Sequence, residues 1–436
     1  SDLPNYLDPS QFEAPPAGSI AVIGGGEQIT ESDFTSFCEK PKQWFFDKMR
    51  KRWFGYTDPI PVSTTLVTWN VGEADPLQVN VSGMFEESEL IVVVLQEIDM
   101  SLGGIMTSGE SQLCLTWQGL LESSLPGVDY NCVFKAQHGG LGMFIFVKES
   151  IREMVTNVVA STVSLGMLGV ANKGGVGVSL NIGLCKILFV GAHFHANMGP
   201  EKCDECYAQL RSQLQLPYGI NSYDYEVWLG DFNYRLDGTE EEIRKSLGDP
   251  VQLFARDQLS QSMRRGQAFQ EFIEPPIMFS PTYRLERWTN KYDWKRAPAW
   301  CDRILFRVSP SYKISIHSYN RVELLYSDHV PVRCVCVLKP RRIVESMLKK
   351  AWDEVFAMSN EITCGLIPTS RLSSACVSFG VIRPYSLTSS VIHLTNTGRV
   401  PVEYSLSCIS TKDGTVANPS WLQFDAGKSI IGTGET

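Results

Sequence analysis

The sequence has no apolar run long enough to cross a bilayer, and its first residues lack the basic and apolar regions of a signal peptide. These absences predict a cytoplasmic protein without a membrane-spanning segment. The sequence contains fewer basic than acidic residues, with 39 Lys and Arg and 48 Asp and Glu, which gives a formal net charge of −9. This acidic balance argues against nucleic acid as a partner, since nucleic-acid-binding domains are typically basic.

The twelve cysteines are scattered and show no spacing of a disulfide framework or of a cysteine-based phosphatase loop. Several lie within apolar, strand-like runs, among them Cys185, Cys334 and Cys336. We therefore expect buried, reduced thiols.

The chain is long enough for more than one domain, and its patterns divide it into four parts. Residues 1–60 form an N-terminal segment of unknown role, partly helical. Residues 61–340 alternate strand-like apolar runs with helical segments, which is typical of a layered α/β domain. Residues 341–362 form an amphipathic linker helix. Residues 363–436 form an all-β module that is shorter than the ~100 residues of an immunoglobulin-like sandwich, so we expect it to be incomplete.

Two features of the N-terminal segment, residues 1–60, indicate its local structure. Thr30 and Asp33 resemble a capping box, and Pro41 is expected to interrupt the helix that follows or to begin a second one. The stretch 42–54 mixes aromatic and basic residues. It either lies at a membrane surface or packs its aromatic side chains on its own domain.

The most informative stretch is an apolar run, Val227 to Leu229, followed by Gly230, Asp231 and Asn233. The apolar run predicts the end of a buried strand, and Gly230 permits a close approach of another backbone. Asp231 and Asn233 stand two positions apart, so both side chains project to one side of the strand end. The pair can hold a water, a hard metal ion or a phosphate oxygen, although an Asx turn would also explain it.

Other polar side chains stand at the ends of apolar runs from distant parts of the chain, which is where layered α/β folds build sites. They are Asn70, Glu97, His193, Asp302, Asp328 and His329. Carboxylate and amide oxygens without a soft-ligand set suit Mg²⁺, and histidines beside carboxylates suit proton transfer. Together they predict metal-assisted hydrolysis of a phosphate ester.

Six motifs occur in order along residues 62–340, and together they closely resemble the inositol polyphosphate 5-phosphatase family. The motifs are Thr68-Trp69-Asn70-Val71, Gln96-Glu97-Ile98, Asn172-Lys173-Gly174-Gly175-Val176, Trp228-Leu229-Gly230-Asp231-Phe232-Asn233-Tyr234-Arg235, Pro298-Ala299-Trp300-Cys301-Asp302-Arg303 and Ser327-Asp328-His329-Val330. The resemblance implies a DNase I-like four-layer α/β sandwich and a phosphoric monoester hydrolase that removes the 5-phosphate of phosphoinositides with Mg²⁺.

The resemblance also implies a role for each matching residue. It implies Glu97 and Asn70 as metal ligands, with Asp328 at the edge of the metal site. Asp231 would position or deprotonate the attacking water, while Asn233 and His193 would hold the scissile phosphate. His329 would contact the same phosphate, oriented by Asp302.

Substrate selection is expected from Lys173 and Asn172, and from the residues that match the family's grip on the 4-phosphate. Those residues are Tyr283, Arg284, Lys295 and Arg296. The grip departs from the family pattern, because Arg284 replaces a Lys and Lys295 is displaced by one position. Each of these basic residues could also be a solvated surface charge. Met167 and Leu168 lie in a segment that can face the membrane in the family, so we expect them either to enter lipid or to pack within their loop.

The segment 192–206 departs further from the family pattern, since Cys203 and Cys206 stand where basic residues usually follow the histidine motif. These cysteines with His193 and His195 leave a zinc site as an alternative.

The C-terminal part resembles an ASH domain through Val377-Ser378-Phe379-Gly380 and Leu394-Thr395-Asn396-Thr397-Gly398. A 5-phosphatase followed by a helix and an ASH domain is the layout of the type II group, that of the Lowe-syndrome (oculocerebrorenal) phosphatase. The resemblance implies peripheral action on cytosolic membrane faces of the endosome, Golgi or plasma membrane, a role in membrane trafficking, and a Rab GTPase as partner. Two alternatives stay open: a nuclease of the same fold, and a GTPase-binding scaffold with little turnover.

Overall fold

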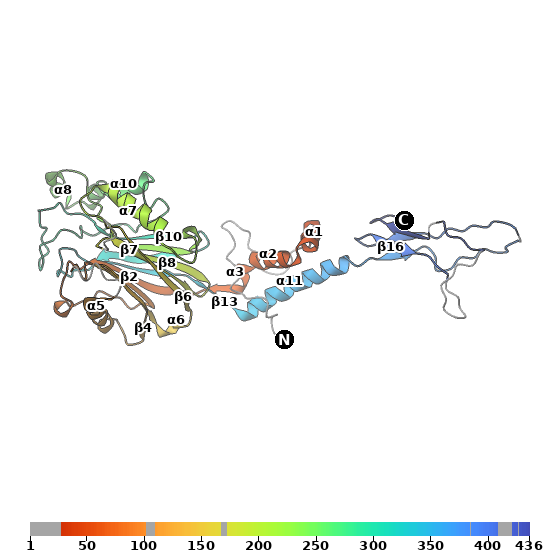
Figure 1. Cartoon of the computed structure of the whole chain (residues 1–436), viewed down its shortest axis with the longest axis horizontal. Coiled ribbons are helices and arrows are strands. Elements are labelled where there is room, and N and C mark those ends of the chain that lie inside the picture. Colours follow the sequence, from red (N-terminus) through yellow and green to blue (C-terminus); the bar gives the residue numbers. More distant parts are fainter. Residues whose placement is uncertain (1–27, 102–109, 167–171, 384, 409–420, 426) are drawn as a thin grey trace. The chain divides into compact units, whose positions relative to one another are not determined.

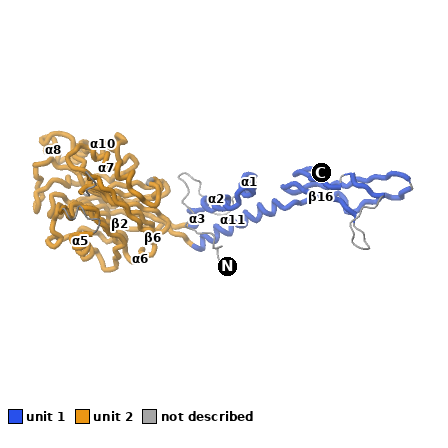
Figure 2. The backbone as a smooth tube through the Cα atoms, viewed as in Figure 1, with its two compact units in different colours: residues 1–14, 20–56, 345–436 blue, residues 15–19, 57–344 orange. Residues whose placement is uncertain are grey.

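The computed structural model describes residues 28–101, 110–166, 172–383, 385–408, 421–425 and 427–436. They form two compact units, which Figure 2 colours separately. The larger unit contains residues 57–344, and the smaller contains residues 28–56 and 345–436. No helix among the described residues is long and apolar enough to cross a membrane.

Two sheets form the centre of the larger unit. The six-stranded sheet has the order β11-β12-β2-β3-β5-β4, and the five-stranded sheet has the order β10-β9-β8-β7-β6. Their strands are β2 (Val62–Asn70), β3 (Leu90–Gln96), β4 (Tyr130–His138), β5 (Leu141–Lys148), β6 (Val155–Ser164), β7 (Gly174–Ile182), β8 (Cys185–His193), β9 (Tyr225–Asp231), β10 (Asp302–Val308), β11 (Ile314–Arg321) and β12 (Val332–Leu338). The alternation of strands and helices predicted for residues 61–340 is confirmed, and β4 and β5 form a hairpin that turns at Gly139-Gly140.

Helices cover the outer faces of the two sheets, which gives four layers (Figure 1). On one side Trp117 of α5 packs against Trp69 of β2, and on the other Tyr207 of α7 packs against Trp228 of β9. The helical elements are η2 (Pro76–Gln78), α5 (Gln112–Ser123), α6 (Glu149–Arg152), α7 (Pro200–Gln213), η4 (Ile220–Ser222), α8 (Glu240–Ser246), α9 (Pro250–Phe254) and α10 (Gln258–Arg264). The predicted DNase I-like α/β sandwich is confirmed.

Strand register brings the motif residues together. His193 of β8 is the partner of Asp231 of β9, which is in turn the partner of Asp302 of β10. Gly230 lies beside the β8 backbone, and a Cβ there would come within 2.0 Å of Ala192 O. A side chain at position 230 would therefore push β9 away from β8 and separate the motif residues.

The smaller unit contains helices from both ends of the chain. They are α1 (Glu31–Glu39), α2 (Pro41–Lys51), α3 (Trp53–Tyr56) and α11 (Glu345–Gly365). The Thr30–Asp33 capping box is confirmed, and Pro41 begins α2. The Phe45 ring lies 4.3 Å from the Trp352 ring of α11, so this aromatic stretch packs within its own unit.

The linker region differs from its predicted limits. Residues 341–343 form a strand, β13 (Arg341–Ile343), that pairs with β1 (Thr57–Pro59), so the helix begins only at Glu345 and continues to Gly365. Beyond it, the described strands are β14 (Ser370–Leu372), β15 (Leu394–Asn396), β16 (Val402–Ser405) and β17 (Lys428–Ile431). They pair as two two-stranded sheets, and the immunoglobulin-like ASH module stays a prediction. Cys185, Cys334 and Cys336 are buried thiols outside any disulfide, as expected.

Candidate active site

The carboxylate of Asp231 is the point where side chains of the two sheets meet. Asp231 is 1% exposed, and its Oδ2 accepts a hydrogen bond from Asn70 Nδ2 at 3.1 Å. The same oxygen lies 3.3 Å from His193 Nε2 and 3.9 Å from His329 Nε2. Burial opposes ionisation, but the hydrogen bond with His193 and the charge of His329 hold the pKa of Asp231 well below its usual value. Asp231 is therefore a buried anion.

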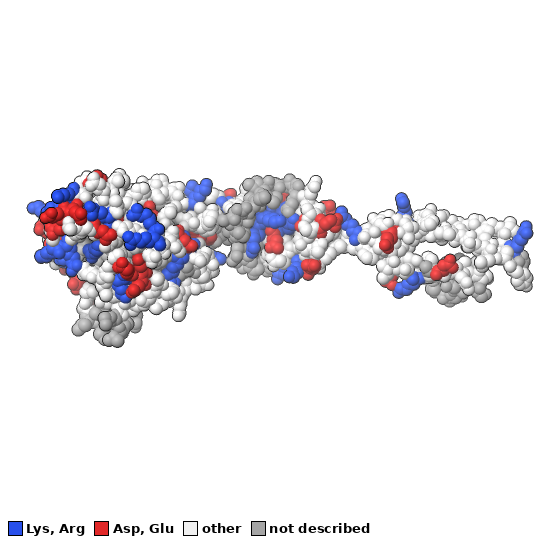
Figure 3. All heavy atoms as spheres, turned by 90° about the horizontal axis from the view of Figure 1, so that it is seen from above, with Lys and Arg blue, Asp and Glu red and all other residues white. Residues whose placement is uncertain are grey.

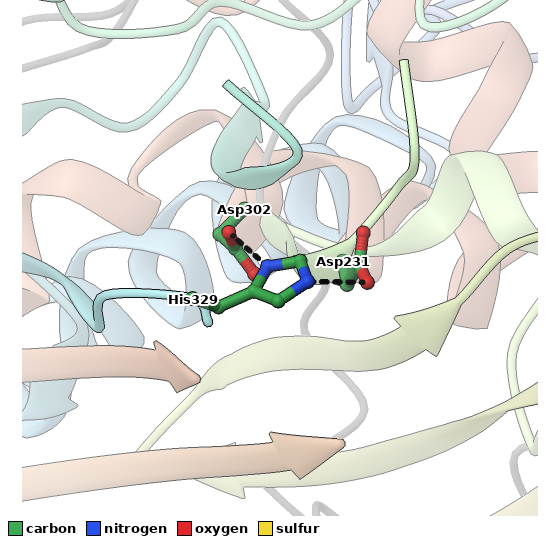
Figure 4. A group of neighbouring side chains, drawn as sticks. All are labelled: Asp231, Asp302 and His329. Carbon is green, nitrogen blue, oxygen red and sulfur yellow. Dashed lines mark hydrogen bonds and ion pairs between the residues drawn. The ribbon is translucent and has the colours of Figure 1, made fainter. Parts of the chain in front are cut away.

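His329 stands between two aspartates, as Figure 4 shows. Its Nδ1 lies 2.9 Å from Asp302 Oδ2, which also accepts a hydrogen bond from Thr282 Oγ1 at 2.6 Å. Burial favours the neutral ring, but Asp302, Asp231 and Asp328 outweigh it and raise the pKa of His329 to about 9. The three drawn residues are close enough to share a metal ion. Because His329 Nδ1 lies at hydrogen-bond distance from Asp302 and its Nε2 faces Asp231, we assign the three residues as a chain of polar contacts.

Glu97 brings a second carboxylate to the site from the end of β3. Its Oε1 lies 3.7 Å from His193 Nε2 and 3.9 Å from Lys173 Nζ, and Lys173 also contacts His193 Nε2. Burial raises the pKa of Glu97, but the charges of His193, Lys173 and His329 and a hydrogen bond with Asn70 bring it below its usual value. Glu97 is therefore ionised while its side chain stays 30% exposed.

Asn233 is held by three hydrogen bonds. Its backbone N–H donates to Asp231 Oδ1 at 3.1 Å, and its Nδ2 donates to Phe194 O at 3.0 Å. Its Oδ1 accepts from Arg235 Nη2 at 2.7 Å. Asn233 and Glu97 have φ angles of 56° and 57°, in the left-handed region that non-glycine residues seldom adopt. Such conformations cluster at functional sites, where the surrounding structure offsets their cost.

These oxygen donors are suited to a hard divalent cation. Glu97 offers an ionised, partly exposed carboxylate. Asn70 Oδ1 accepts one hydrogen bond from Gly72 N at 3.0 Å, which leaves its second lone pair free. Asp328 lies at the edge, with its Oδ2 3.5 Å from Arg284 Nε. Carboxylate and amide oxygens are the ligands that Mg²⁺ and Ca²⁺ take in proteins.

Two residues predicted to bind substrate lie beside this centre. The Tyr283 ring is 4.4 Å from the His329 ring. Arg284 Nε is 3.1 Å from Asp293 Oδ2 and 3.5 Å from Asp328 Oδ2, so two carboxylates hold this guanidinium. Asp293 was missed in the sequence, because only the folded loop brings its carboxylate to Arg284.

The other two members of the predicted grip are on the surface. The Lys295 side chain is 80% exposed and lies 4.0 Å from Asp293 Oδ2. Arg296 is exposed and donates to Asn197 Oδ1. Both remain candidate substrate contacts, but the structure does not bring them to Asp231 as it does Lys173.

The Asn172 side chain keeps an unused acceptor, because its Oδ1 is buried without a hydrogen-bond partner. Met167 and Leu168 lie outside the described residues, so their membrane contact stays a prediction.

The unusual segment 192–206 supports the motif around Asp231. Its helix α7 carries Asp204, whose Oδ1 accepts a hydrogen bond from Tyr234 OH at 2.7 Å and whose Oδ2 accepts from Ser262 Oγ at 3.1 Å. The alternative zinc site is not formed among the described residues. His195 Nε2 bonds Leu165 O at 2.8 Å, and in the described part of the chain neither Cys203 nor Cys206 belongs to a group of three or more His, Cys, Asp or Glu side chains close enough to share a metal.

The pKa values of the two histidines beside Asp231 are expected to be shifted in opposite directions. Burial and the charge of Lys173 lower the pKa of His193, whereas the three aspartates raise that of His329 to about 9. NMR of imidazole nitrogens in metal-free protein should therefore show a neutral His193 and a cationic His329 at pH 7.5. Because the folded pKa of His329 exceeds the unfolded value of ~6.5, its contribution to stability is complete below pH ~6.5 and is lost as the pH rises through about 9. Two rings titrating together near pH 6.5 would contradict this assignment.

Comparison with known proteins assigns the chain that carries these residues to a family. The sequence matches the Endonuclease/Exonuclease/phosphatase family 2 over residues 67–335, more than half of the chain. The inositol-1,4,5-trisphosphate 5-phosphatase 1 of Schizosaccharomyces pombe is 33% identical over 284 residues, which cover 62% of this chain and 25% of the relative. The type II inositol 1,4,5-trisphosphate 5-phosphatase of Mus musculus is 26% identical over 359 residues, which cover 79% and 36%. The chain thus spans between a quarter and just over a third of the length of these relatives.

Solved structures agree on the fold. The inositol polyphosphate 5-phosphatase domain of SPsynaptojanin, in complex with inositol (1,4)-bisphosphate and calcium ion, has a TM-score of 0.64 at 27% identity and covers 74% of this chain and 97% of its own. Cimex nitrophorin has a TM-score of 0.55 at 20% identity over 64% of this chain and 99% of its own, a likeness of fold alone. The chain belongs to the Endonuclease/Exonuclease/phosphatase family 2, and within it is similar to the inositol polyphosphate 5-phosphatases.

Proposed function

We propose that this protein is a Mg²⁺-dependent phosphoinositide 5-phosphatase. Its principal substrate would be phosphatidylinositol 4,5-bisphosphate, with the 3,4,5-trisphosphate as a further one. The observation that carries the proposal is the convergence of Asn70, His193 and His329 on the Asp231 carboxylate, with Glu97 beside them. The names of the relatives and the inositol bisphosphate and calcium ion bound to the SPsynaptojanin domain support the same chemistry.

Each residue of the site would have its own role in hydrolysis. Glu97 and Asn70 would hold the metal, with Asp328 at its edge, and the metal would polarise the phosphoryl group and neutralise part of its charge. The Asp231 anion would orient a water molecule and accept its proton during attack on phosphorus. No covalent intermediate is needed, since water itself is the nucleophile.

Hydrogen-bond donors around the phosphoryl group would stabilise the negative charge that develops on its oxygens. His329, as an imidazolium held by Asp302, would donate to one oxygen through Nε2. His193 and the free amide hydrogen of Asn233 would contact the same group. Lys173 would add positive charge beside them.

Selection of the inositol ring would rest on the basic residues around this centre. Arg284 and Arg296, with Tyr283 and Lys295, would contact the 4-phosphate. Because Asp293 holds Arg284 at 3.1 Å, substrate would have to displace or share that carboxylate. Asn172 has an unused buried oxygen that would accept a hydrogen bond from a ring hydroxyl.

The lipid substrate implies peripheral binding at cytosolic membrane faces, with Met167 and Leu168 as candidate lipid contacts. The C-terminal module would add a Rab GTPase as partner. A nuclease of the same fold is a weaker candidate. The net charge is −9, and Figure 3 shows positive and negative side chains interspersed over the visible face of the larger unit, without the single basic field that binds nucleic acid.

Metal dependence and site assignment can be tested together by phosphate release from short-chain phosphatidylinositol 4,5-bisphosphate. Wild type with Mg²⁺ should release phosphate, and an excess of chelator should abolish release. Glu97→Gln should lower kcat/KM by at least about a hundredfold, because the amide removes the ligand's charge. The matched control Glu153→Gln, at an exposed position, should behave as wild type. Full activity in chelator would contradict the metal mechanism, and no release from any phosphoinositide would favour the scaffold alternative.

A further inference from the structure

Two arginines with buried guanidinium groups come from the two longest motifs, and their surroundings differ. Arg303 is 0% exposed and fully neutralised. Its Nη1 and Nη2 lie 2.9 and 3.2 Å from the two oxygens of Asp257, and its Nε lies 2.7 Å from Glu274 Oε1. A buried arginine paired with two carboxylates in this way is a structural element of the fold.

Arg235 has no such partners. None of the ion pairs found in the described part of the chain includes it, and its Nε and Nη1 are buried without a hydrogen-bond partner. Its Nη2 donates a hydrogen bond to Asn233 Oδ1 at 2.7 Å. Burial disfavours its charge, but Asp231 and other neighbours keep its pKa above the usual arginine value, so it is a cation.

Two contacts of the Arg235 guanidinium lead to groups at the proposed phosphate position. Its bond to Asn233 Oδ1 fixes which end of that amide is the donor, and Nδ2 then gives one hydrogen to Phe194 O and keeps the other free. Its guanidinium carbon lies 4.4 Å from the centre of the Tyr283 ring, and that ring lies 4.4 Å from the ring of His329. Arg235 therefore supports Asn233 directly and His329 through Tyr283.

An N–H group that is buried without an acceptor is costly to keep, so the unused Nε and Nη1 of Arg235 call for an anionic acceptor. A phosphate dianion supplies that anion when substrate is bound. We infer that Arg235 is a positioning residue of the active site, which orients the Asn233 amide and the Tyr283–His329 stack toward one phosphoryl group and offers it charged N–H donors. This inference rests on the proposed function for its kinetic consequences, but not for its prediction about phosphate binding.

The kinetic test compares Arg235→Met and Arg235→Lys with wild type, with Arg264→Met at an exposed site of α10 as matched control. Loss of a charge-assisted hydrogen bond should lower kcat of Arg235→Met by about 10- to 100-fold. Arg235→Lys keeps the charge but not the planar fork, so it should restore KM to within about threefold of wild type and leave kcat at least about tenfold low. The control should be unchanged. Values of kcat and KM for Arg235→Met within twofold of wild type would overturn the inference.

A double-mutant cycle separates positioning from a general loss of structure. If Arg235 acts through Asn233, Arg235→Met should cost much less in an Asn233→Ala background than in the wild type, because the amide it orients is gone. Costs that simply multiply would overturn this part of the inference. Arg235→Gln serves in the cycle if Arg235→Met does not fold, as judged by thermal unfolding.

Binding of inorganic phosphate to the Mg²⁺-loaded protein, measured by calorimetry, tests the same residue without turnover. Arg235→Met should bind phosphate at least about tenfold more weakly than wild type, because the charged N–H donors of the guanidinium are lost. If wild type hydrolyses nothing but shows this difference, the proposed hydrolysis fails and the role of Arg235 stands. Equal affinity for phosphate in the two proteins would overturn the role of Arg235 even if wild type is an active phosphatase.

Discussion

Asp231→Asn is expected to lower kcat by at least about a thousandfold while the protein stays folded. The amide has the same shape, but it loses the negative charge that would accept the proton of the attacking water. It would also turn a donor toward Asn70 Nδ2 or His193 Nε2, both of which now face the Asp231 carboxylate. The reaction would then begin without its base and with a misoriented metal ligand.

The measurement is single-turnover phosphate release with saturating Mg²⁺, together with circular dichroism to confirm folding. Asp129→Asn, on an exposed loop, is the matched control and should keep full activity. A folded Asp231→Asn protein with kcat within tenfold of wild type would show that another group activates the water.

Arg303→Met is expected to destabilise the fold by about 3–5 kcal/mol, because it leaves the carboxylates of Asp257 and Glu274 buried without their cation. The same three residues replaced together by Met, Leu and Leu should recover much of that loss, since no charge then remains buried. Chemical denaturation with a two-state analysis measures both values.

The control for this prediction is Arg244→Met, which breaks an exposed ion pair with Glu240 on α8. Exposed pairs of this kind contribute about 0–1 kcal/mol, so the change should be small. A loss at Arg303 no larger than that at Arg244 would mean that the buried network does not stabilise the fold.

The positions of the motif residues along the strands could be predicted from sequence, because apolar runs mark buried strands. Asp231 and Asp302 were recognised at strand ends, and strand pairing places them opposite one another. The order of the strands could not be derived from local patterns, since β8 and β9 pair across an intervening helix. The family resemblance, and not periodicity, supplied the four-layer arrangement.

Side-chain contacts over long sequence distances were the part that sequence could not provide. The segment 192–206 departs from the family pattern, yet Asp204 within it accepts a hydrogen bond from Tyr234, close to Asp231 in the sequence. Arg284 looked like a free phosphate contact, yet Asp293 and Asp328 hold it. In each case the deciding factor is where a flexible polar side chain finds its partner, and a one-dimensional pattern does not encode that.

The most direct test of the proposed function is the identity of the product formed from short-chain phosphatidylinositol 4,5-bisphosphate. The purified protein with Mg²⁺ is incubated with this lipid, and ³¹P NMR assigns the phosphate that remains on the ring. A 5-phosphatase yields phosphatidylinositol 4-phosphate and one equivalent of inorganic phosphate, and it leaves added phosphatidylinositol 4-phosphate intact. Formation of phosphatidylinositol 5-phosphate, or recovery of unchanged bisphosphate, would contradict the account.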